Sequence, residues 1–98
     1  MYVRLTRYKA DPARRADGLR WIDEKGKDLT RDMGAQQIHL VEFGPGDYAM
    51  LAIFADKTAA DAASSKAMEN FKAAAQAGLL DPATIQRSEG EVVKTLVG

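Results

Sequence analysis

The first stretch of the chain alternates between two kinds of side chain, which is typical of a strand. From residue 2 to residue 8, Val3 and Leu5 fall on one side, and Tyr2, Arg4, Thr6 and Tyr8 fall on the other. A period of two with Tyr, Val and Thr enrichment predicts a β-strand.

The next stretch changes to the period of a helix. Asp11–Pro12 suits a helix start, with Asp as the N-cap and Pro at the first helical position. From Leu19 to Met33, small or apolar residues recur at steps of three and four, and Gly34 follows as a C-terminal cap. The pattern predicts one long amphipathic helix from about residue 11 to residue 33.

Two β-like runs follow with a short connection between them. Residues 36–43 place Ile38 and Leu40 on one face and His39, Val41 and Phe43 on the other, and residues 48–55 are almost continuously apolar. The turn formers of residues 44–47 separate the runs. A hairpin is predicted, and its second strand is expected to be central, with both faces covered.

The last third of the chain predicts a second helix and a final strand. Residues 59–77 are rich in alanine, Thr58 and Asp61 have the spacing of a capping box, and Gly78 follows. The inner stripe is expected to be Ala60, Ala63, Ala67, Phe71 and Ala74. Residues 84–97 are β-like around Gly90, and residues 91–97 look best formed.

The order β-α-β-β-α-β predicts a single ferredoxin-like α+β domain over residues 1–98. In this fold a four-stranded antiparallel sheet carries both helices on one face. Tyr2, Tyr8 and Phe43 would then line a face that no helix covers, together with one side of the third strand. A large exposed apolar patch implies a partner, and the simplest one is a second copy related by a two-fold axis.

Composition narrows the function classes. The 46% hydrophobic and 29% charged residues are ordinary for a globular protein, and 14 basic residues balance 14 acidic ones. A neutral balance gives no support to nucleic-acid binding. No apolar run approaches a membrane span and no signal-peptide core follows Met1, so we expect a cytoplasmic protein without membrane association. The absence of cysteine excludes disulfides and thiolate sites.

The chain resembles the dimeric α+β barrel superfamily, and within it the antibiotic-biosynthesis-monooxygenase-like domains. The residues that carry the resemblance are the opening strand Tyr2–Tyr8, the long helix ending at Met33–Gly34 and the strand-to-helix junction Ile53–Ala60. The family commonly has Trp where this chain has Phe54. The resemblance implies a homodimeric barrel with a ligand cavity, and members include cofactor-free oxygenases, haem-degrading enzymes, isomerases and cyclases.

Three residues are candidates for catalysis. His39 is the only histidine and would be the natural general acid or base near neutral pH; a surface or interface role is the alternative. Arg4 could hold a carboxylate or stabilise an enolate, and Tyr8 could donate a hydrogen bond or a proton. Alternatively Arg4 pairs across strands with Glu42 or Glu91.

Other side chains are candidates for the lining of a substrate cavity, with core packing as the alternative. They are Tyr2, Thr6, Tyr48, Met50 and Phe54. Trp21, at the edge of the first helix's apolar stripe, is expected to pack against the sheet or hairpin.

Some differences between this chain and the family bear on which cofactors it is expected to bind. Haem-degrading relatives ligate haem with a histidine on the second helix, and residues 58–78 contain none. The cofactor-free oxygenases use Asn, Trp and Arg around the substrate, whereas Asn70 and Trp21 fall on separate predicted helices. No His, Asp or Glu cluster has metal-ligand spacing. We therefore expect neither cofactor nor metal.

The functional expectation is a homodimeric small-molecule enzyme or binding protein. It would resemble the cofactor-independent monooxygenases or the isomerases and would act on an apolar or aromatic metabolite. The alternative is a non-catalytic dimerisation or ligand-sensing module.

Overall fold

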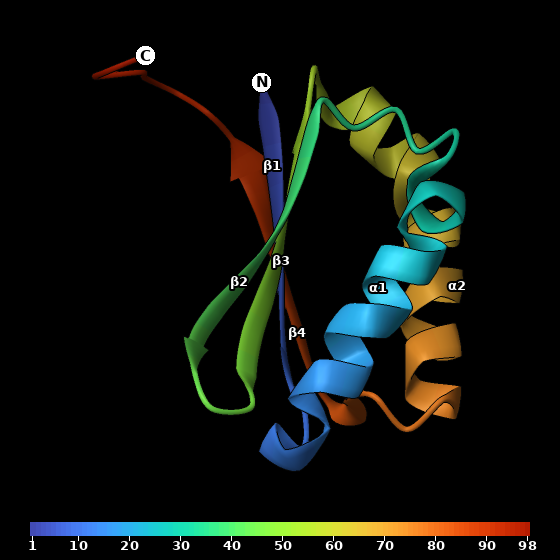
Figure 1. Ribbon diagram of the computed structural model, residues 1–98. Coiled ribbons are helices and arrows are strands. Elements are labelled where there is room, and N and C mark those ends of the chain that lie inside the picture. The colour runs from blue at the N-terminus through green and yellow to red at the C-terminus, as the bar shows by residue number, and fades with distance from the viewer.

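The computed structural model describes residues 1–98 and has the predicted order of elements. The elements are β1 (Tyr2–Lys9), a short 3-10 helix (Pro12–Arg14), α1 (Arg15–Thr30), β2 (Gln37–Gly44), β3 (Asp47–Phe54), α2 (Lys57–Gln76) and β4 (Asp81–Glu91). The strands pair antiparallel in the order β2-β3-β1-β4. Both helices lie on one side of this sheet (Figure 1). This arrangement confirms the ferredoxin-like α+β fold.

Aspartates cap both helical segments. The Asp11 carboxylate accepts a hydrogen bond from the Ala13 amide at 2.9 Å, so the predicted start of the first helix is confirmed. The predicted cap of the second helix is wrong by two residues. Asp56, and not Thr58, accepts from the Ala59 amide at 2.8 Å. An aspartate in extended backbone directly before the first helical residue satisfies the free amides of the first turn.

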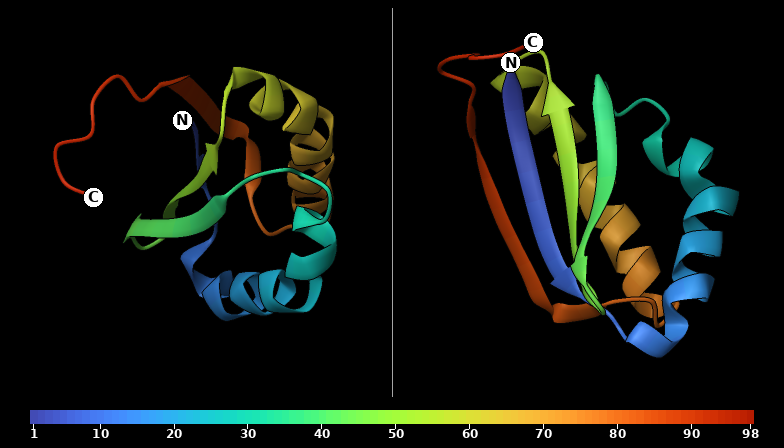
Figure 2. Two further views of the ribbon diagram at one scale, coloured as in Figure 1. Left: turned by 90° about the horizontal axis from the view of Figure 1, so that it is seen from above. Right: turned by 60° about the vertical axis from the view of Figure 1, so that its left-hand side comes forward.

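The final strand begins earlier and ends earlier than the pattern predicted. β4 pairs with β1 from Asp81 to Glu91, and only the Val92 amide extends the pairing, through a hydrogen bond to the Met1 carbonyl. The apolar residues beyond it, such as Val93 and Leu96, are exposed. This segment runs away from the helices (Figures 1 and 2). The residues predicted as its best-formed part therefore lie outside the sheet.

The two faces of β1 are reversed relative to the sequence prediction. Tyr2, Arg4, Thr6 and Tyr8 are the buried positions of the strand and face the helices. Val3 and Leu5 occupy the helix-free face, where they lie opposite Ile53 and Leu51 of β3. The prediction that Tyr2 and Tyr8 line the uncovered face is wrong, whereas Phe43 is 57% exposed, as expected there.

Small residues let α2 approach the sheet closely. Ala60, Ala63, Ala67 and Ala74 are buried, which confirms the predicted inner stripe, and Phe71 is half-buried beside them. Around one end of this stripe Phe54 is completely buried, and around the other end Tyr8 packs with Tyr48 and Leu80. Neither α1 nor α2 has the length and apolar character that a bilayer-spanning helix needs.

Candidate functional site

A cavity of about 250 Å³ separates α1 from the helix-facing side of the sheet. Its floor comes from β1, β2 and β3, one wall comes from α2, and α1 covers it. Eighteen of its 27 lining residues are hydrophobic. A largely apolar pocket with a few polar groups is the usual form of a small-molecule site.

Helix α1 closes the cavity without packing tightly on the sheet. Leu19, Ile22 and Leu29 line the cavity, yet no residue of α1 is fully buried. Gly18 and Gly26 line it as well, and a Cβ atom at either position would meet no atom within 4 Å. The predicted apolar stripe of the first helix therefore faces a cavity.

Strand β1 supplies a row of polar side chains to a mostly apolar lining. Arg4, Thr6 and Tyr8 alternate along the strand, so all three point toward the helices, and all three line the cavity. Burying polar groups in apolar surroundings is costly unless they find partners. The partners of Arg4 and Tyr8 are therefore informative about what the cavity can bind.

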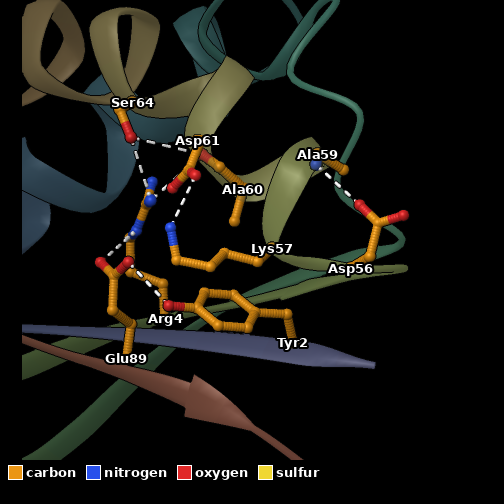
Figure 3. Close-up of polar contacts among 9 residues, drawn as sticks. All are labelled: Tyr2, Arg4, Asp56, Lys57, Ala59, Ala60, Asp61, Ser64 and Glu89. Carbon is orange, nitrogen blue, oxygen red and sulfur yellow. Dashed lines mark hydrogen bonds and ion pairs between the residues drawn. The ribbon is translucent and has the colours of Figure 1, made fainter.

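The Arg4 side chain is held on three sides and unpartnered on the fourth (Figure 3). Its Nε donates to the Glu89 carboxylate at 3.0 Å, and its Nη2 donates to the Ser64 hydroxyl at 3.0 Å and the Ala60 carbonyl at 3.1 Å. The residue is only 4% exposed, and its buried Nη1 has no hydrogen-bond partner. An unsatisfied nitrogen on a buried guanidinium is a strong donor for an oxygen of a bound molecule.

Aromatic rings surround the other end of the row. The Tyr8 ring stacks on Tyr48 with centroids 5.7 Å apart and meets Phe71 edge-on at 6.0 Å. Burial, together with the nearby Tyr48, raises the pKa of Tyr8 to about 12. At neutral pH the Tyr8 hydroxyl is therefore protonated and can donate a hydrogen bond, but it is a poor base.

The raised pKa of Tyr8 predicts a loss of stability in strong alkali. An unfolded tyrosine ionises near pH 10, whereas folded Tyr8 holds its proton to about pH 12. Between these values the unfolded chain binds fewer protons, so the free energy of unfolding should fall as pH rises. Urea unfolding from pH 9 to 11.5 measures this slope. Tyr8→Phe should flatten it, and an unchanged slope in that variant would contradict the assignment.

His39 lies on the opposite face of the sheet from Arg4 and Tyr8. It pairs in register with Leu51, on the helix-free face, and its Nε2 lies 3.0 Å from the Gln37 side-chain oxygen. The residue is exposed and does not line the cavity. The hypothesis that His39 shares a site with Arg4 and Tyr8 therefore needs correction, because the sheet separates them.

Four of the five other residues that were predicted to line a substrate cavity do line it, and one does not. Thr6, Tyr48, Met50 and Phe54 line the cavity. Tyr2 does not; it belongs to the core, and its hydroxyl donates to Glu89 at 2.9 Å. Arg4 pairs with Glu89, and not with Glu42 or Glu91 as considered above. Glu42 instead accepts from Arg15 and from the Tyr48 hydroxyl, each at 2.8 Å.

Two residues that line the cavity were not predicted to do so from the sequence. Trp21 of α1 and Asn70 of α2 line the same cavity as Arg4. The Asn70 amide donates to the Leu29 carbonyl at 2.6 Å and so ties the two helices together. The sequence signal for Asn70 was its place directly before Phe71, at the edge of the apolar stripe. Asn, Trp and Arg side chains therefore line one cavity, although no such arrangement was predicted from the sequence of this chain. No group of three or more His, Cys, Asp or Glu side chains is placed to hold a metal ion.

Comparison of the fold with solved structures gives closely similar chains at low sequence identity. A protein of unknown function from Nitrosomonas europaea, NE2512, is 16% identical with a TM-score of 0.75, covering 99% of this chain and 93% of its own. A candidate antibiotic biosynthesis monooxygenase from Deinococcus radiodurans is 11% identical with a TM-score of 0.74, covering 99% and 97%. SnoaB from Streptomyces nogalater, a cofactor-independent oxygenase, is 17% identical with a TM-score of 0.68, covering 97% and 95%.

No protein-family model matches the sequence, and no similar curated protein is found. At these identities the structural likeness establishes the fold. The chain has the ferredoxin-like fold of antibiotic-biosynthesis-monooxygenase-like proteins, as the sequence resemblance implied.

Proposed function

We propose that this protein binds an apolar or aromatic metabolite between α1 and the sheet and acts on it as a cofactor-independent, monooxygenase-like enzyme. The observation that carries the proposal is that buried Arg4 lines a mostly apolar cavity and that its Nη1 has no hydrogen-bond partner. A ring would occupy the apolar volume, and an oxygen of the ligand would accept from Nη1. A fixed hydrogen-bond donor is the kind of group that stabilises negative charge developing on an enolate oxygen.

The lining restricts the chemistry. It contains no histidine, and its one carboxylate, Asp11, is exposed and caps the 3-10 helix. The cavity therefore offers donors for a developing oxyanion but no buried base near neutral pH. Suitable substrates are aromatic ketones that carry an already acidic C–H conjugated with the carbonyl. Anthrone is such a compound: its CH₂ becomes a carbonyl whose oxygen comes from O₂, and the other oxygen atom leaves as water with the two hydrogens.

Oxygen consumption with anthrone as the probe tests the proposed activity. The wild-type protein, without added metal or flavin, should accelerate oxygen uptake. Arg4→Met removes the donor but keeps an apolar side chain, and it should weaken probe binding roughly 10- to 100-fold, the usual worth of a hydrogen bond to a charged group. His39→Ala should leave binding and uptake unchanged. Loss of activity in His39→Ala with normal Arg4→Met would contradict the proposed site.

A ligand-sensing module is the second candidate, and the absence of a base among the cavity residues favours it. Tight binding of the probe without oxygen uptake would support this function.

For either function we propose a homodimer. Val3, Leu5, Leu51 and Ile53 lie together on the helix-free face, only partly buried, and a second copy would cover them.

A further inference from the structure

The charge around Arg4 is already balanced before any ligand enters. Glu89 accepts from Arg4 Nε at 3.0 Å and from the Tyr2 hydroxyl at 2.9 Å (Figure 3). These two hydrogen bonds lower the pKa of Glu89, so its carboxylate is ionised at neutral pH. The nearby Lys57 is engaged with Asp61 at 2.8 Å. The cavity therefore presents a donor whose positive charge is neutralised by its own partner.

Arg4, the hydrogen-bond donor, lines the cavity, whereas Glu89, its counter-charge, lies outside the lining. Arg4 is 4% exposed and lines the cavity, whereas Glu89 is not among the lining residues and its side chain is 29% exposed at the outer strand β4. A ligand in the cavity would thus lie against Arg4, whose Nη1 lacks a partner, and not against Glu89. A carboxylate there would add an uncompensated negative charge in apolar surroundings, which is costly. A neutral carbonyl would accept the same hydrogen bond without that cost.

We infer that Glu89 sets the charge selectivity of the cavity: by neutralising Arg4 it makes the site prefer a neutral carbonyl ligand over a carboxylate of the same shape. Glu89 does not touch the ligand and acts through Arg4, so it is a specificity-determining residue. The inference rests on the proposed function, because it requires that the cavity bind a ligand.

Two probes of nearly the same shape test the inference. These are 1-acetonaphthone, a neutral aryl ketone, and 1-naphthoate, the matching carboxylate. Titration calorimetry at pH 7 on the wild-type protein should give a dissociation constant for the ketone at least about tenfold lower than that for the carboxylate, the ratio expected from roughly 1.4 kcal/mol. Glu89→Gln removes the counter-charge and keeps the shape. In this variant the preference should vanish or reverse.

Three further variants separate selectivity from folding. Glu89→Asp keeps the negative charge and should keep the wild-type preference. Glu91→Gln removes the same charge from the same strand, but Glu91 makes no ion pair with Arg4, so the preference should be unchanged. Arg4→Met should weaken ketone binding both in the wild-type protein and in the Glu89→Gln variant.

The outcomes distinguish the two levels of the proposal. A wild-type preference for 1-naphthoate, or an identical preference in Glu89→Gln, would overturn the inference and leave the binding cavity standing. Failure of both probes to bind the wild-type protein would overturn the proposed function together with the inference. If Glu89→Gln does not fold, a preference of the wild-type protein for 1-naphthoate still overturns the inference, and Glu89→Asp, which should keep the preference for the ketone, still tests the role of the negative charge.

Discussion

Replacing Gly26 by leucine should abolish ligand binding while making the protein more stable. Gly26 lies within α1 and lines the cavity, and a Cβ atom there would meet nothing within 4 Å. A leucine side chain would therefore enter the cavity without a clash and occupy the volume that a ligand needs. Removing a glycine from a helix interior also stabilises it by about 1 kcal/mol, and filling a void adds apolar burial.

Gly26→Ala is the matched control. It gains most of the helix stabilisation but leaves the cavity largely open, so probe binding should persist. The measurements are urea unfolding for the two variants and calorimetry with 1-acetonaphthone. A Gly26→Leu protein that is more stable and still binds the probe with wild-type affinity would show that the ligand lies elsewhere.

Phe54→Ala should cost most of the stability of the domain. Phe54 is the largest completely buried side chain, and it packs with Tyr2 and Ala60 where β3 passes into α2. Truncating a buried phenylalanine costs about 3–5 kcal/mol through lost burial and the cavity that remains. Total stabilities of small domains are about 5–15 kcal/mol, so much of the folded population is at risk at modest temperature.

Phe43→Ala provides the comparison for this loss. Phe43 is 57% exposed on the helix-free face, where the Arg7 guanidinium lies 4.8 Å from its ring centroid. Its truncation should change the unfolding free energy of the domain by about 0.5 kcal/mol or less. The urea midpoints of Phe54→Ala and Phe43→Ala, measured at one protein concentration, compare the two losses of stability. Equal losses would contradict the described core.

The sequence predicted the elements well because each carries a local signal. Asp11–Pro12 marks the first helical segment, and the alanine stripe from Ala60 to Ala74 marks the buried side of the second helix. The family resemblance of the opening strand, of the end of the first helix and of the junction before the second helix implied the same fold. The end of β4 was missed because Val93 to Val97 have β-like composition but no strand to pair with.

The orientation of β1 could not be predicted from its alternation. A period of two shows that Arg4 and Tyr8 share a face, but not which face the helices cover. The structure turns the polar row inward because Glu89, Ser64 and the Ala60 carbonyl provide partners for Arg4. These partners are 56 to 85 residues away in the sequence. The same reversal separates His39 from the cavity.

The four methionines report directly on whether the ligand lies between α1 and the sheet. Met33 and Met50 line the cavity, whereas Met1 and Met68 are 56% and 61% exposed. With ¹³C-methyl methionine, titration with 1-acetonaphthone should move the signals of Met33 and Met50 and leave those of Met1 and Met68 in place. Binding that leaves the Met33 and Met50 signals unmoved would show that the ligand does not lie between α1 and the sheet.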